Sequence, residues 1–237
     1  MKNTLKYTLA ALAATVLGTQ AALITGVSAS ASSEINGSGL FRAAFSTVDG
    51  SGLTGVGTAL DTHGNAPDPT LMWLTTGSIG FTGAADTDPA MTFDLGGLYD
   101  VDTLRVWNYN ETGSNGDGTF NWTTHGADEI AVSAGATLGT MTQLQTINVL
   151  EAGGTAAEAA QDFASTLTGV QFIRFTIVSN HDGDNFVTDV YNTALDTTQF
   201  TGLSEVRFEG TAVPEPATLS MMAAFGGAVL FIRRKLM

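Results

Sequence analysis

Apolar and polar side chains alternate along several short stretches of the chain. AMTFDLGG (90–97) places methionine, phenylalanine and leucine at every second position, and EIAVSA (129–134) and LQTINVL (144–150) alternate in the same way. Successive side chains of a β-strand point to opposite faces of a sheet, so a period of two predicts strands with one buried face. Glycine, asparagine, aspartate, serine and threonine between the stretches indicate turns. The pattern predicts an all-β sandwich or barrel.

Two further stretches carry large apolar side chains on both faces of the expected strand. VQFIRFTIVS (170–179) is apolar on both sides, as a central strand of a sandwich would be. VDTLRVWNYN (101–110) alternates aliphatic residues with an arginine, Trp107 and Tyr109, and we expect these two rings to pack against the core or the sheet. One stretch, TAAEAAQDF (155–163), is compatible with a helix but is too short to change the fold class.

The N-terminus has the order of zones that is typical of an export signal. Lys2 and Lys6 precede a ten-residue apolar segment, LAALAATVLG (9–18). We therefore expect a signal helix within residues 1–31, removed by signal peptidase. Small residues that fit the cleavage site are Ala22, Ala29 and Ala31.

The C-terminus predicts a transmembrane helix over Ala217–Ile232. As a helix these sixteen residues would span about 24 Å, slightly less than a hydrocarbon core of about 30 Å. Arg233, Arg234 and Lys235 follow at once and are expected to stay in the cytoplasm as a membrane stop. Everything before the helix would then face outward, which agrees with the export signal.

The segment VPEPATLS (213–220) precedes this apolar run, and a basic tail follows it. The three parts together resemble the PEP-CTERM sorting signal of Gram-negative bacteria, over residues 213–237. The resemblance implies that an exosortase recognises and cleaves the chain near its sorting motif, after anchorage in the inner membrane in transit. The released domain would end at the cell surface or in the extracellular matrix. A simple tail anchor is the alternative. The sorting-motif residues are Val213, Pro214, Glu215 and Pro216.

Without the two ends, residues 32–212 form one domain of strongly acidic composition. They hold four arginines, no lysine and 22 of the 23 acidic residues, a net charge of −18. Such a surface repels nucleic acid and anionic lipid but suits divalent cations. The chain has no cysteine, which excludes thiol catalysis and cysteine metal sites.

The order of four segments resembles a known fold: MWL (72–74), MTFDLGGLYDVDTLRVWNYNE (91–111), VQFIRFTIVSN (170–180) and GLSEVRF (202–208). It resembles the galactose-binding-like jelly-roll β-sandwich of discoidin-type domains and many carbohydrate-binding modules, over most of residues 35–210. Domains of this fold bind glycans, lipids or proteins, so the resemblance does not identify the ligand.

The same resemblance implies a structural calcium ion, held by loop carbonyls, an aspartate and a late glutamate. Asp49 in TVDGSGL and Glu205 in LSEVRF are the matching residues. Oxygen ligands on a tight loop suit Ca²⁺, although the loop from Asp49 to Trp73 is longer than usual in the family. The other interpretation makes Asp49 a turn residue and Glu205 a solvated strand end. SNHDGDN (179–185) looks like the start of a calcium loop, but turn chemistry explains it better.

A sugar-binding site needs exposed aromatic rings beside amide and carboxylate groups. The segment WNYNETGSNGDGTFNW (107–122) has both and is expected to form a loop after a strand, where binding sites commonly lie. DTHGNAPDP (61–69) joins it if the two loops share an edge. The candidate ligand-binding residues are His63, Asn65, Asn110, Glu111 and Trp122.

The sequence gives little support for catalysis. Paired carboxylates could hydrolyse a glycoside, but among 22 acidic residues a pair is expected by chance. None of the three histidines lies in an H-E-x-x-H motif, and no G-x-S-x-G motif occurs. The sequence therefore predicts a non-enzymatic surface or matrix protein that binds glycan, with extracellular polysaccharide as the expected partner. Two alternatives stay open: a structural or adhesive protein that contacts other proteins, and a glycoside hydrolase.

Overall fold

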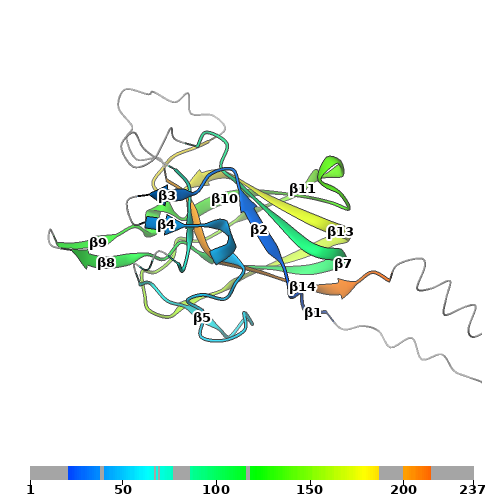
Figure 1. Ribbon diagram of the computed structural model, residues 1–237, viewed down its shortest axis with the longest axis horizontal. Coiled ribbons are helices and arrows are strands. Elements are labelled where there is room, and N and C mark those ends of the chain that lie inside the picture. Colours follow the sequence, from blue (N-terminus) through cyan, green and yellow to red (C-terminus); the bar gives the residue numbers. More distant parts are fainter. Residues whose placement is uncertain are drawn as a thin grey trace, which may run out of the picture.

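The computed structural model describes residues 21–37, 40–66, 68, 70–76, 86–115, 118–186 and 200–214 (Figure 1). Within these ranges the regular structure consists of β-strands and short 3-10 helices. The strands are β1 (Ala22–Leu23), β2 (Ser28–Ala31), β3 (Ile35–Gly37), β4 (Leu40–Arg42), β5 (Thr62–His63), β6 (Trp73–Leu74), β7 (Ala90–Asn108), β8 (Thr112–Asn115), β9 (Gly118–Asn121), β10 (Ala127–Gly135), β11 (Thr142–Asn148), β12 (Glu158–Ala159), β13 (Gln161–Asn180) and β14 (Gly202–Ala212). The 3-10 helices are η1 (Ala44–Thr47), η2 (Thr123–His125) and η3 (Leu138–Thr140).

The large sheet runs in the order β1-β14-β7-β13-β10-β11 and is antiparallel, with β2 added to β7 and β6 added to β14. Two-stranded ribbons form between β3 and β4, β5 and β12, and β8 and β9. Figure 1 shows β7, β13 and β14 side by side, with the β8–β9 hairpin projecting at one end of the molecule.

The long strand β7 contributes to two layers that face each other. Phe93 lies in the half of β7 that pairs with β2, whereas Phe208 of β14 is opposite Leu104 in the other half. In a straight strand Phe93 and Leu104 would be about 36 Å apart, yet the rings of Phe93 and Phe208 are 5.1 Å apart. The strand must therefore fold back, and its pairing with β13 is irregular between Asp94 and Tyr99. The predicted all-β sandwich is confirmed.

The core lies between these layers and follows the alternation seen in the sequence. The inward positions of the predicted strands are at most 5 % exposed, and each such aliphatic or aromatic side chain contributes about 1.5–3 kcal/mol on burial. They are Met91, Phe93, Leu95, Leu104, Val106, Ile130, Val132, Ile147, Val149, Ile173, Phe175, Ile177, Val206 and Phe208.

A loop spanning residues 48–65, the covering loop, packs on the outer face of β7 and β14. It buries the residues that alternate with the core positions, so Arg105 is 3 % exposed and Trp107 is fully buried. The indole Nε1 of Trp107 donates to the carbonyl oxygen of Asp61 at 3.2 Å. The predicted packing of Trp107 against the sheet is confirmed.

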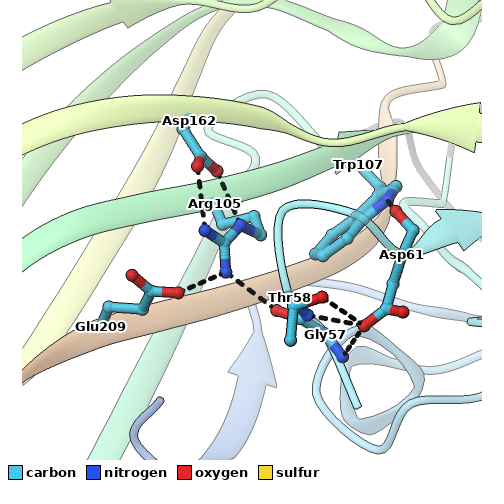
Figure 2. Close-up of polar contacts among 7 residues, drawn as sticks. All are labelled: Gly57, Thr58, Asp61, Arg105, Trp107, Asp162 and Glu209. Atoms are coloured by element: carbon cyan, nitrogen blue, oxygen red, sulfur yellow. Dashed lines mark hydrogen bonds and ion pairs between the residues drawn. The ribbon is translucent and has the colours of Figure 1, made fainter. Parts of the chain in front are cut away.

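Arg105 joins the covering loop to the sheet (Figure 2). Its Nε and Nη2 donate to the two carboxylate oxygens of Asp162 at 2.7 and 2.9 Å. Its Nη1 donates to Glu209 at 2.6 Å and to the carbonyl oxygen of Gly57 at 3.0 Å. In the loop itself, the Asp61 carboxylate accepts the backbone N–H of Gly57 at 2.9 Å. One buried guanidinium thus connects two strands and a loop.

The two ends of the described chain leave the sandwich at the same end. Ala22 in β1 is opposite Gly210 in β14, and the N–H of Val213 donates to the carbonyl oxygen of Leu98 at 2.8 Å. Figure 1 shows β1 and the last residues of β14 at the end opposite the β8–β9 hairpin. Residues 22–31, placed within the expected signal peptide, supply β1, β2 and the buried Ile24.

The apolar core of the export signal and the expected helix over 217–232 lie outside the described residues, as do Glu215 and Pro216. The part of the chain that the structure describes contains no helix long and apolar enough to cross a membrane.

Candidate functional site

Four ring side chains form an aromatic cluster at the end of the sandwich that carries the β8–β9 hairpin: Phe120, Trp122, His125 and Phe200. The rings of Phe120 and Trp122 are stacked, with centroids 4.2 Å apart and planes 26° apart. His125 is 6.3 Å from Trp122 and 5.5 Å from Phe200. The cluster thus joins residues 120–125 to Phe200, which is distant in sequence.

Local geometry explains how the cluster forms. Phe120 lies in β9, and the chain then turns through η2, where the N–H of His125 donates to the carbonyl oxygen of Trp122 at 3.0 Å. An isolated bridge between Gly126 and Gly202 brings the start of β14 alongside, and with it Phe200. A Cβ on Gly126 would lie 2.7 Å from the Asn108 side chain, so a larger residue here would displace Asn108.

Trp122 keeps 38 % of its surface exposed although it stacks on Phe120. The other rings of the cluster are partly buried, and Tyr109 lies fully buried behind His125 at 6.5 Å. Burial lowers the pKa of His125 below its ordinary value, against the attraction of Asp182, so its ring is neutral at pH 7. The cluster therefore presents the exposed indole of Trp122, held in place by stacking on Phe120, and this ring can stack on the apolar face of a ligand.

Three of the five predicted ligand-binding residues are buried. His63 is fully buried, with Nδ1 2.7 Å from the carbonyl oxygen of Gly64 and Nε2 3.0 Å from that of Ser51. Burial lowers the pKa of His63, which favours the neutral ring. Asn110 is also fully buried, and its Nδ2 donates to the carbonyl oxygen of Thr155 at 2.8 Å. Both residues hold loops together at the hairpin end.

Glu111, the third buried residue, pairs with Arg42. The two side chains are 2 % and 3 % exposed, and Arg42 Nη2 donates to Glu111 Oε1 at 2.7 Å. The Tyr109 hydroxyl donates to Glu111 Oε2, and burial, followed by the charge of Glu111, raises the pKa of Tyr109 well above its ordinary value. This buried triad fixes the end of β7 from which the hairpin starts.

Asn65 and Trp122 are the predicted residues that retain exposed surface. Asn65 is half-buried, and its Nδ2 donates to Thr112 Oγ1 at 2.6 Å and to the carbonyl oxygen of Gly154 at 2.8 Å. The structure thus brings the two predicted loops to one end, as expected. Sequence reasoning missed Phe120, His125 and Phe200. The i, i+2 spacing of Phe120 and Trp122 was a usable signal, whereas nothing local indicates Phe200.

The predicted calcium residues lie together on the outer face of β14. Glu205 is fully buried, and burial first, then the nearby Asp49, raises its pKa to about 8, against the effects of Arg207 and the backbone of Gly50. Arg207 Nη2 is 2.8 Å from Glu205 Oε1 and its Nη1 donates to the carbonyl oxygen of Val48. Apart from the ion pair with Arg207 and the contact with the Gly50 backbone, the Glu205 oxygens have no hydrogen-bond partner among the described residues.

This arrangement fits a cation in part. A buried carboxylate, a neighbouring aspartate and a glycine-rich turn provide the oxygen-rich chemistry that Ca²⁺ requires, but Arg207 already offers a positive charge to Glu205. The described ranges contain no group of three or more histidine, aspartate or glutamate side chains placed to hold a metal. Backbone carbonyls and water would have to complete the coordination.

Comparison with known proteins identifies the C-terminal segment. Residues 212–235 match the family model of the PEP-CTERM protein-sorting motif, which confirms the motif predicted from VPEP. The motif marks the chain for exosortase processing, export and sorting to the cell surface, as predicted. A comparison with curated protein sequences finds no match.

Several solved structures resemble the fold. The carbohydrate-binding module CBM32-5 of a family 89 glycoside hydrolase from Clostridium perfringens, in complex with GalNAc-β-1,3-galactose, has 12% identity and a TM-score of 0.49, over 79% of this chain and 99% of that one. The family 32 module of NanJ from the same organism, in complex with galactose, has 15% identity and a TM-score of 0.44, over 80% and 99%. The family 89 hydrolase itself has 14% identity and a TM-score of 0.44 over 81% of this chain, which spans 15% of the hydrolase.

Proposed function

We propose that this protein is a non-enzymatic glycan-binding protein of the cell surface or extracellular matrix of a Gram-negative bacterium. It passes through the inner membrane with its C-terminal helix as a transient anchor, and an exosortase then processes it. The aromatic cluster binds extracellular polysaccharide. The observation that carries the proposal is the exposed ring of Trp122, stacked on Phe120 at 4.2 Å at the loop end of a rigid sandwich.

The position of the sorting motif supports this role. β14 begins at Gly202, which is bridged to Gly126 beside the aromatic cluster, and ends at Ala212, where the motif begins. Its 11 residues extend about 35 Å. The aromatic cluster and the first residues of the motif therefore lie at opposite ends of the domain, so attachment through the C-terminus leaves the cluster free to meet a polymer.

The charge of the domain favours a neutral glycan. Residues 32–212 carry four arginines and 22 acidic residues, and a field of this sign repels anionic polymers. Asn121 and Asp182 are exposed near the cluster and provide hydrogen-bonding groups for sugar hydroxyls. A neutral polysaccharide that presents apolar ring faces and hydroxyls matches this surface.

Calcium is the second part of the proposal. We propose that Ca²⁺ binds between Asp49 and Glu205 and fastens the covering loop to β14. The support is the full burial of Glu205 beside Asp49, with carboxylate oxygens that have no hydrogen-bond partner among the described residues apart from the ion pair with Arg207 and the Gly50 backbone. Its role there is structural, because the site lies on the outer face of the sheet and not among the rings of the aromatic cluster.

The test of the glycan site uses the full-length chain in mild detergent with a soluble galactan, xylan and mannan, followed by isothermal titration calorimetry. We expect saturable binding to at least one polymer, and Trp122→Ala to weaken it by about 5- to 150-fold, since stacking on an aromatic ring contributes about 1–3 kcal/mol. Leu60→Ala is the control, because Leu60 is 92 % exposed in the covering loop. Equal binding by both variants would show that the cluster is not the site, and release of reducing ends would show an enzyme.

A further inference from the structure

A hollow lies on the outer face of the layer formed by β2, the first half of β7 and the second half of β13. We name it the sheet-face groove, and its volume is about 230 Å³. It is distinct from the aromatic cluster and shares no residue with it. Its lining includes Ser28, Ser30, Thr92, Asp94, Leu138 and Phe172.

Strand register explains why these residues share one face. Ser28 is opposite Asp94, which is in turn opposite Phe172, so the three form one row across the sheet. Ser30 and Thr92 form the next row. The residues between them in each strand, such as Phe93, belong to the core, because side chains alternate between faces.

The wall of the groove comes from a turn between β10 and β11. In η3 the side chains of Thr137 and Thr140 form a capping box that fixes the turn. Leu138 in this turn is 58 % exposed. Phe172 on the sheet is half-buried. The groove therefore has two apolar walls on an otherwise polar face, and neither Leu138 nor Phe172 belongs to the buried core.

Hydrogen bonds fix the orientation of the Asp94 carboxylate in the groove. Asp94 Oδ1 accepts the N–H of Gly96 at 2.9 Å and the Nε2 of Gln171 at 3.0 Å, which holds the carboxylate in place. The hydroxyls of Ser28, Ser30 and Thr92 can each donate and accept. Sugar rings need this combination, since their hydroxyls require both kinds of partner and their C–H faces require apolar contact.

Size and charge narrow the class of ligand. The volume of about 230 Å³ is below the roughly 300–1,000 Å³ of pockets for drug-sized molecules, which suits one or two sugar units. Arg174 is opposite Thr92 in the sheet and lies 3.8 Å from Asp88, while Asp94 lines the groove itself. A neutral sugar fits this balance better than an anionic one.

We propose that the sheet-face groove is a second saccharide-binding site, which takes one or two neutral sugar units. This proposal depends on the proposed function in one respect, which is that the ligand is a saccharide. Phe172 is opposite Gly135 in β10, and Gly126 beside the aromatic cluster lies nine residues earlier, about 30 Å along a strand. Two sites at this separation let one molecule bind two polysaccharide chains, which raises avidity and cross-links the polymer.

The experiment titrates the full-length chain in mild detergent with soluble galactan, xylan and mannan, and measures affinity, stoichiometry and light scattering of the mixture. Phe172→Ala removes the aromatic wall, and Ser30→Gln fills the groove from an exposed position. Thr146→Gln, exposed on β11, is the matched control. Thermal unfolding of each variant confirms that it is folded.

We expect Trp122→Ala to retain one weaker site, and the double variant Trp122→Ala/Ser30→Gln to lose binding at least tenfold further. Either groove variant alone should abolish cross-linking but leave binding at the aromatic cluster. If Trp122→Ala loses all binding, or if Ser30→Gln and Phe172→Ala behave like Thr146→Gln, the second site is refuted and the cluster stands. If only the groove variants lose binding, the cluster proposal fails and the groove stands. Absence of binding to all three polymers refutes both.

Discussion

Glu205 is a residue whose burial and raised pKa cannot be seen from the sequence. As a strand residue in LSEVRF it resembles a solvated strand end, yet it is fully buried, and burial raises its pKa from 4.5 to about 8. Between these values the folded protein binds a proton that the unfolded chain releases. Folding therefore becomes less favourable as the pH rises through this window.

This predicts an unusual pH dependence in the presence of a chelator. We expect the melting temperature to fall as the pH rises from about 5 to 8, and Glu205→Gln to remove this part of the dependence, because glutamine cannot ionise. Added Ca²⁺ should raise the melting temperature at pH 8 in the original protein but not in Glu205→Gln. A chelated protein that melts at the same temperature as the calcium-loaded one at pH 8 would refute the calcium site.

Arg105 predicts a different kind of defect. Its guanidinium is 3 % exposed and pairs with Asp162 and Glu209, which are 40 % and 30 % exposed. Arg105→Ala should cost about 3 kcal/mol of unfolding free energy, because it breaks buried hydrogen bonds to the sheet and the covering loop. Arg105→Lys should restore only part of this unfolding free energy, since lysine cannot make the bidentate contact with Asp162.

The measurement is urea unfolding, with Arg174→Ala as the matched control. Arg174 is 37 % exposed and 3.8 Å from Asp88, so its loss should change stability by less than about 0.5 kcal/mol. Equal effects of the two alanine variants would show that Arg105 does not fasten the loop.

At the scale of elements, the first strands of the domain decide where the mature chain begins. Ser28–Ala31 pairs with β7 through four residues, and Ile24 is 3 % exposed in the core. Cleavage after Ala22 keeps these contacts. Cleavage after Ala29 removes Ile24 and half of β2, and cleavage after Ala31 removes Ile24 and all of β2.

We therefore predict that the mature protein begins close to residue 23, as N-terminal mass spectrometry of the exported protein can show. A chain that begins at residue 32 should lose at least about 2 kcal/mol from Ile24 alone, and more from the strand hydrogen bonds. Equal denaturant midpoints for chains that begin at residues 23 and 32 would contradict this.

In the segment TAAEAAQDF (155–163), tertiary contacts override a local preference for helix. Its alanines and glutamate favour a helix, but the segment forms β12 and the start of β13. Phe163 packs against the core opposite Leu104, and Glu158 pairs with His63. Pairing with two existing strands buries more surface than a two-turn helix could, so the strand is preferred.

At the scale of the whole molecule, the acidic balance predicts how partners respond to salt. With 22 acidic residues against four arginines in residues 32–212, an anionic polysaccharide such as alginate should bind at least tenfold more weakly than a neutral one at low ionic strength. The difference should shrink as sodium chloride rises from about 20 to 200 mM, because the Debye length falls below about 10 Å. Binding of the neutral polymer should not change with salt. Tighter binding of alginate at low salt would refute this.

The sequence by itself determined the strand positions, the inward core residues, the all-β class and the C-terminal sorting motif. These features depend on local order: the period of two fixes which side chains face inward, and the motif is a contiguous set of residues. Reading the alternation also placed Trp107 and Tyr109 in packed positions, where both are fully buried.

Only the tertiary structure decided which polar residues are buried and which rings are exposed. Asn110 and Glu111 look like loop residues, but the covering loop and Arg42 enclose them. Phe200 meets His125 only because β14 starts beside Gly126, and the sheet-face groove exists only because β2 pairs with β7. Burial and side-chain grouping depend on contacts between residues far apart in the chain, and local periodicity carries no information about which distant segment will cover a given face.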